Sequence, residues 1–128
     1  MPEGYIDLYC ERLAPGLLGE PLNALTNLLF VLAAILLARD LARSSQTRRD
    51  DWLLAGLVAA VGLGSLVFHM AATRATSVLD KVFIALFILV FFQRWLTRVA
   101  GLGLGSSLAG AAVFVAVSLG IGKVVPPD

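Results

Sequence analysis

Apolar residues occur in four long stretches of this chain, and short polar segments separate them. The stretches cover about residues 22–38, 52–72, 78–92 and 99–121. A helix needs about 20 mostly apolar residues to cross about 30 Å of hydrocarbon. Helices are the ordinary way to satisfy backbone polar groups in lipid. The pattern therefore predicts an all-α fold, a polytopic transmembrane helical bundle of four spans (22–122), preceded by an acidic segment (1–21) and followed by a short tail (123–128).

The composition supports a lipid environment. Hydrophobic residues make up 59% of the chain and charged residues 15%, against about 45–50% and about 25% in soluble domains. These values exclude disorder, a coiled coil and a standard soluble core. A net charge of +1 gives no electrostatic reason to expect nucleic acid as a partner. Because Cys10 is the one cysteine, an internal disulfide framework and a multi-cysteine metal cluster are excluded.

The arginines and lysines between the stretches predict an orientation. Basic residues are enriched in cytoplasmic loops. The first and third loops carry Arg39, Arg43, Arg48, Arg49, Arg94 and Arg98. The opposite side carries Arg12, Arg74 and Lys123. We therefore expect a multi-pass protein with its N-terminus outside. The short loops are typical of a bacterial inner-membrane protein.

Three polar residues of the second and third stretches are predicted to lie at one depth. Ser65 and His69 are four residues apart, so they share a helix face, and Asp80 follows across a short loop. Two chemistries fit these residues: a nucleophilic triad and a metal site with a carboxylate that moves protons. No G-x-S-x-G nucleophile elbow is present. Plainer alternatives are an interhelical hydrogen bond for His69 and an ion pair between Asp80 and Lys81.

The N-terminal segment carries further oxygen ligands. Asp7, Glu11 and Glu20 offer carboxylates of the kind that calcium prefers, but their spacing matches no EF-hand loop. A solvated acidic segment is the alternative interpretation. Asn23 and Asn27, four residues apart in the first stretch, are more typical of hydrogen bonds between helices than of ligands.

Two motifs together resemble a known family. The runs D-L-Y-C-E-R (7–12), P-G (15–16) and E-P-L-N-A-L-T-N-L (20–28) resemble the start of the alkaline ceramidases. The run G-S-L-V-F-H (64–69), with Asp80 eleven residues after His69, resembles the serine–histidine–aspartate signature of a wider membrane hydrolase superfamily. That superfamily includes adiponectin-receptor-like and haemolysin-III-like proteins. The resemblance covers about residues 6–89.

The resemblance implies an intramembrane zinc amidase that cleaves ceramide-like lipids into a sphingoid base and a fatty acid. In this pattern His69 is one of three zinc-binding histidines, Asp80 is the general base and acid, and Ser65 helps to hold the oxyanion. It also implies a calcium site, whose acidic ligands match Asp7, Glu11 and Glu20. Shorter spacing before Glu20, and Arg12-Leu13 in place of polar residues, depart from the eukaryotic pattern.

One departure concerns the zinc site itself. The family has seven spans, and its other two zinc histidines form an H-x-x-x-H pair on the last span, whereas this chain has four predicted spans and one histidine. Three accounts stay open: an incomplete copy of a longer hydrolase, a half-protein whose partner chain supplies the missing helices, and a noncatalytic bundle. The corresponding alternative functions are lipid binding without turnover, as in a receptor-like protein, and a purely structural helix bundle.

Overall fold

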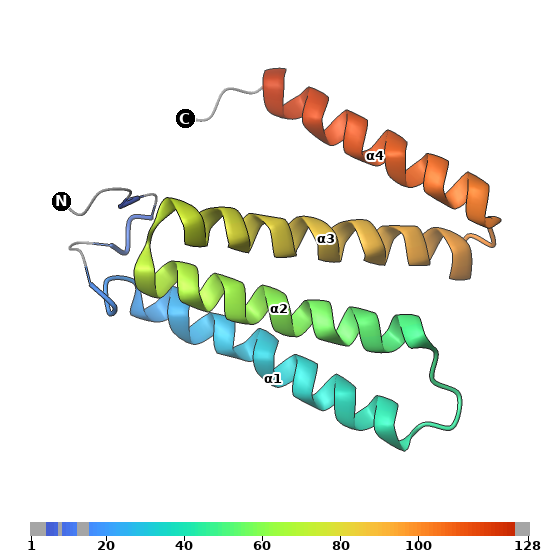
Figure 1. Cartoon of the computed structure of the whole chain (residues 1–128), viewed down its shortest axis with the longest axis horizontal. Helices are drawn as coiled ribbons and strands as arrows, with labels where there is room; N and C mark the ends of the chain where they lie inside the picture. Colours follow the sequence, from blue (N-terminus) through green and yellow to red (C-terminus); the bar gives the residue numbers. More distant parts are fainter. Residues whose placement is uncertain (1–4, 8, 13–15, 125–128) are drawn as a thin grey trace. The chain divides into compact units, whose positions relative to one another are not determined.

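The computed structural model describes residues 5–7, 9–12 and 16–124, with side chains as far as residue 120. It contains the helices α1 (Pro21–Arg43), α2 (Arg49–Ala71), α3 (Arg74–Arg98) and α4 (Leu104–Val124) (Figure 1). The described residues form no strand, apart from an isolated bridge between Tyr5 and Thr73. The predicted all-α fold is therefore confirmed. The chain divides into two compact units, Met1–Phe87 and Ile88–Asp128.

Local sequence explains where the helices begin and end. Pro21 opens α1, because its fixed φ and missing N–H suit the first helical position. The backbone N–H of Arg48 donates to Asp51 Oδ2 at 2.9 Å, which satisfies a polar group at the start of α2. Helix α2 is capped by Ala72, the left-handed residue after its last position, which has φ 48° and whose N–H donates to Phe68 O at 2.7 Å. The next helix begins two residues later, so the link between α2 and α3 is short.

The fourth helix starts later than the apolar pattern predicts. Residues 99–103 are not helical, and Gly101 has a φ of 69°. Glycine adopts this left-handed conformation without steric cost, so the turn forms there. The helix continues to Val124, which places the first two residues of the predicted tail in α4. The remainder of that tail lies outside the described residues.

Close contacts of α2 with its neighbours depend on two glycines. A Cβ atom added at Gly62 would lie 2.9 Å from Phe30 Cβ and 3.0 Å from the backbone nitrogen of Val31. A Cβ atom added at Gly64 would lie 2.7 Å from Phe83 Cδ2. Small residues are the usual means by which membrane helices approach closely. These glycines hold α1 and the first part of α3 against the half of α2 that carries Ser65 and His69.

The second unit joins the end of α3 to α4. Gln93 Nε2 donates to Ser107 Oγ at 3.0 Å, and both residues are buried. The rings of Phe92 and Phe114 lie 4.9 Å apart. An interhelical hydrogen bond of this kind satisfies polar groups that lipid would leave unpaired.

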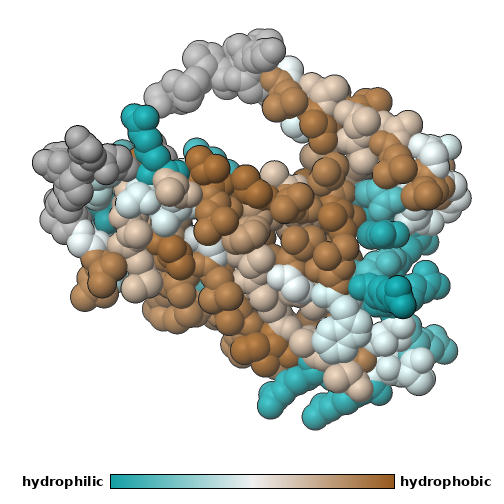
Figure 2. Space-filling view, viewed as in Figure 1, coloured by the Kyte–Doolittle hydropathy of each residue, from teal (hydrophilic) through white to brown (hydrophobic). Residues whose placement is uncertain are grey.

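The surface of the helices is largely apolar. Figure 2 shows hydrophobic residues over most of the visible surface of the helices. Helices α1, α2 and α3 are each long and apolar enough to cross a membrane, whereas the described apolar part of α4, Leu104–Gly120, is shorter. The exposed leucines of α1 are Leu22, Leu25, Leu28, Leu29, Leu32, Leu36 and Leu37. This pattern fits lipid-facing helices of an integral membrane protein, and the fourth crossing stays a prediction.

Candidate functional site

Buried polar side chains gather at one end of the first unit. They come from the N-terminal segment, from the start of α1, from the end of α2 and from the start of α3 (Figure 1). The side chains are Arg12, Glu20, Ser65, His69 and Asp80. Buried ionisable groups require compensating partners, so the contacts of each one define what the site can do.

Backbone contacts fix the ends of the helices that carry the site. The N–H of Ile6 donates to Ala72 O at 2.8 Å and ties the N-terminal segment to the end of α2. Thr73 and Thr76 exchange bonds at the start of α3: Thr73 N donates to Thr76 Oγ1 at 3.1 Å, and Thr76 N donates to Thr73 Oγ1 at 3.2 Å. These bonds satisfy donors at the helix start. Asp80 therefore sits less than two turns into α3, opposite the last turns of α2.

Ser65 and Asp80 are in direct contact. The hydroxyl of Ser65 donates to Asp80 Oδ1 across the α2–α3 hairpin. Lys81, the alternative partner for Asp80, is exposed. A nucleophilic triad places histidine between serine and aspartate, whereas here serine bonds aspartate directly and His69 bonds a different carboxylate. The described contacts therefore do not have the form of a triad.

His69 is held from two sides. Its Nδ1 atom contacts Glu20 Oε2. The ring also lies 5.0 Å from the ring of Tyr9 and 5.2 Å from the ring of Phe68. Nδ1 is therefore engaged within the chain, and Nε2 is the nitrogen that could bind a metal.

Arg12 connects the N-terminal segment to both helices of the α1–α2 pair. Its Nε donates to Glu20 Oε1 at 2.5 Å, one terminal nitrogen donates to Gly16 O at 3.2 Å, and the other donates to the backbone carbonyl of His69. The guanidinium also lies 5.7 Å from the centre of the Tyr5 ring. From the sequence, Arg12 was counted as a charge and as part of the family motif, and it was given no role in the site. One signal was available: it is the one basic residue within the acidic segment.

The Arg12–Glu20 pair is ionised on both sides. Burial acts to raise the pKa of Glu20, but hydrogen bonds from Arg12, His69 and Asn23 and the charge of Arg12 outweigh it, so the pKa lies below its ordinary value. Burial acts to lower the pKa of Arg12, and the contacts with Glu20 and Tyr5 outweigh it, so that pKa lies above its ordinary value. Each charge stabilises the other in a buried setting.

The three residues proposed for calcium have different surroundings. Glu11 accepts hydrogen bonds from the backbone nitrogens of Leu22 (2.5 Å) and Asn23 (3.1 Å), so it caps the start of α1. Glu20 is buried between Arg12 and His69, and Asp7 is exposed. No group of three His, Cys, Asp or Glu side chains that could hold a metal occurs in the described part of the chain.

The donor set for zinc is incomplete within this chain. Catalytic zinc sites have three protein ligands. His69 is the one histidine among the 128 residues, and its described carboxylate contact is with Glu20 rather than Asp80. The residues present therefore fit one ligand position of such a site, that of His69, and do not supply the other two.

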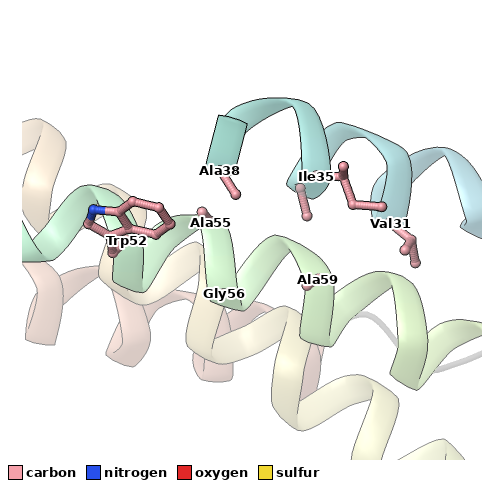
Figure 3. A pocket seen from close by; sticks show the side chains of 8 residues that line it. Val31, Ile35, Ala38, Trp52, Ala55, Gly56 and Ala59 are labelled. Carbon is pink, nitrogen blue, oxygen red and sulfur yellow. The ribbon is translucent and has the colours of Figure 1, made fainter. Parts of the chain in front are cut away.

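An apolar hollow of about 300 Å³ lies at the other end of the α1–α2 pair. Figure 3 shows its lining, formed by the second half of α1 and the first half of α2. The lining residues are Val31, Ala34, Ile35, Ala38, Trp52, Ala55, Gly56 and Ala59. None of the buried site residues lines this hollow, so it offers apolar contact without chemistry.

Comparison with known protein families gives a match over most of the chain. The family model described as Ceramidase matches residues 9–124. The match continues past the predicted limit at residue 89 and includes α4. No curated protein and no solved structure matches the chain.

Proposed function

Because the chain belongs to the ceramidase family, we propose that it is an integral-membrane hydrolase that cleaves the amide bond of ceramide-like lipids. The observation that carries this proposal is the buried bond between Ser65 and Asp80, one helical turn from His69 on α2. A carboxylate, a hydroxyl donor and an imidazole thus lie at one end of apolar helices, which is the depth at which we expect the polar end of a membrane lipid.

Amide hydrolysis requires proton transfer at both stages. In the proposed reaction, the oxygen of a water molecule bonds to the carbonyl carbon while Asp80 accepts a proton from that water. The C–N bond then breaks as Asp80 returns the proton to the leaving amine, which yields a fatty acid and a sphingoid base. General acid–base catalysis of this kind contributes about 10²–10⁴-fold to a rate. Ser65 donates its hydrogen bond to the oxyanion during the attack.

We assign His69 one ligand position of a zinc site through Nε2. The remaining ligands would come from outside these 128 residues, either from the rest of a longer hydrolase or from a partner chain, which are two of the three accounts that the sequence leaves open. A metal ion polarises a carbonyl and activates water when it is bound. The basic residues of the loops favour an outside position for the N-terminus and the site, in a bacterial inner membrane.

Formation of fatty acid and sphingoid base from ceramide tests this proposal. The chain is expressed in membranes together with the helices that supply the missing H-x-x-x-H pair, given a long-chain ceramide, and assayed for free fatty acid and sphingoid base. We expect His69→Ala and Asp80→Asn to abolish product formation. Asp40→Asn, the same type of change at an exposed position of α1, should leave product formation unchanged. Retention of activity in Asp80→Asn would overturn the proposed acid–base role.

One observation favours a second candidate function. The chain has a single histidine, which fits lipid binding without turnover as in a receptor-like member of the superfamily. Saturable binding of ceramide by folded chain with no product would favour that function and exclude hydrolysis by the chain itself.

A further inference from the structure

We propose that the guanidinium of Arg12 is the cation at the position where the resemblance predicts a calcium ion. We also propose that Glu20 positions His69 and is not a calcium ligand. The second part rests on the proposed function, since positioning matters only if His69 serves the site. The first part is independent of it.

The contacts of Arg12 are those of a bridging cation. A bound cation in this position would join the N-terminal segment to the start of α1 through oxygen ligands. The guanidinium instead reaches three oxygens from separate parts of the chain: Glu20 Oε1, Gly16 O and His69 O. Its side chain has no exposed surface. A planar guanidinium has donors in a fixed fork, so one side chain can hold several acceptors at once.

The carboxylates are already used by the protein. Both oxygens of Glu20 have partners, because Oε1 accepts from Arg12 and Oε2 contacts His69 Nδ1 and lies 3.3 Å from Asn23 Nδ2. Both oxygens of Glu11 accept backbone N–H groups of α1. A calcium ion at Glu20 would also face the positive charge of Arg12 at short range. The described donor set therefore does not fit calcium.

The bond to Glu20 fixes the tautomer of His69. The Glu20 carboxylate is paired with the Arg12 guanidinium through Oε1 and contacts His69 through Oε2. A carboxylate in an ion pair accepts hydrogen bonds and donates none. Nδ1 must then carry the hydrogen, and the neutral ring presents its lone pair at Nε2. A carboxylate in this position orients a metal-binding histidine. Arg12 acts one step further away, because it holds Glu20 in place and ionised.

Nitrogen NMR of the full chain in detergent tests the tautomer. With ¹⁵N-labelled histidine, His69 gives the one pair of imidazole signals, since the chain has one histidine. At alkaline pH without metal, where imidazole is neutral, we expect a protonated Nδ1 and an unprotonated Nε2. Glu20→Gln should reduce this preference. Glu11→Gln, the same change at the carboxylate that caps α1, should leave the signals unchanged.

A protonated Nε2 in the unsubstituted chain would overturn the positioning role of Glu20. This measurement needs no variant, so a Glu20→Gln chain that fails to fold leaves the proposal falsifiable. It also needs no substrate. If the unsubstituted chain has the expected tautomer but does not hydrolyse the lipid, the proposed function alone is refuted. If it hydrolyses the lipid but carries the hydrogen on Nε2, the positioning role alone is refuted.

Binding of Ca²⁺ alone tests the role of Arg12. Equilibrium dialysis of the full chain with radioactive calcium should show no saturable binding at millimolar concentration. The thermal unfolding midpoint should be the same with calcium and with a chelator, because only a ligand of the folded state would raise it. Stoichiometric calcium with a raised midpoint would overturn the proposal. Arg12→Lys should lower the thermal unfolding midpoint less than Arg12→Gln does, but it should still lower it, since an ammonium cannot span the same three oxygens.

Discussion

The Nδ1 atom of His69 contacts Oε2 of Glu20, a residue 49 positions earlier in the chain. This contact joins the last turn of α2 to the residue that precedes α1. Because Glu20 also bonds Arg12, the N-terminal segment, α1 and α2 meet through a single carboxylate. The stability of the chain and the orientation of the imidazole therefore depend on the same three side chains.

Removal of Arg12 should strongly destabilise the chain. Arg12→Ala leaves the buried Glu20 carboxylate without its cation, and loss of one partner of a buried ion pair costs about 3–5 kcal/mol. Denaturant unfolding in detergent, followed by circular dichroism, measures the free energy. The double variant with Arg12→Ala and Glu20→Gln should lose less free energy of unfolding than the two single variants lose in sum, because the two residues share one interaction. A loss below about 1 kcal/mol for Arg12→Ala would match an exposed pair and contradict this account.

Glu11 and Asp7 should behave differently although both were predicted calcium ligands. Glu11→Ala removes the acceptor for two backbone N–H groups at the start of α1. Loss of a helix cap costs about 0.5–2 kcal/mol. Asp7→Ala alters an exposed side chain and should change the free energy of unfolding by less than about 0.5 kcal/mol. The same unfolding assay, run in chelator, compares them, and equal losses would argue for a shared role.

The sequence was sufficient to predict the features that depend on neighbouring residues. Apolar length predicted the helices. The short link at Ala72 and Thr73 brings the end of α2 opposite the start of α3, so a common depth for Ser65 and Asp80 could be predicted, although their direct hydrogen bond was not. The late start of α4 was missed because the apolar pattern ran through Gly101, where the backbone turns.

The roles of Arg12, Glu11 and Glu20 could not be predicted in the same way. Arg12 meets the carbonyl of His69 across 57 positions, and that contact depends on how an irregular segment folds back on two helices. Composition shows that the segment is acidic, but it does not distinguish carboxylates that bind an ion from carboxylates that cap a helix or pair with an arginine. The spacing in the sequence is the same for all three uses.

Gly62 should be intolerant of a methyl group while Gly56 should accept one. Gly62→Ala places Cβ against Phe30 and the backbone of Val31, so α1 and α2 must separate. Overpacking of this kind costs about 1–3 kcal/mol. Gly56 lies in the same helix with nothing within 4 Å of an added Cβ. Gly56→Ala should therefore be neutral or stabilise by up to about 1 kcal/mol, through reduced freedom of the unfolded chain. Thermal unfolding in detergent separates the two, and an equal response would show that α1 and α2 do not pack closely at Gly62.

Substitution of Ser65 should lower turnover more than it lowers lipid binding. Ser65→Ala removes the hydroxyl that donates to Asp80 in the resting chain and that we assign to the oxyanion during attack. Loss of one oxyanion donor costs about 10²–10³-fold in kcat. An interaction made only in the transition state leaves KM nearly unchanged.

Ser118→Ala, the same change on the exposed face of α4, serves as the control and should alter neither constant. Kinetics of fatty acid release measure both. An unchanged kcat in Ser65→Ala would exclude the oxyanion role, whereas a raised KM with normal kcat would place Ser65 in lipid binding alone.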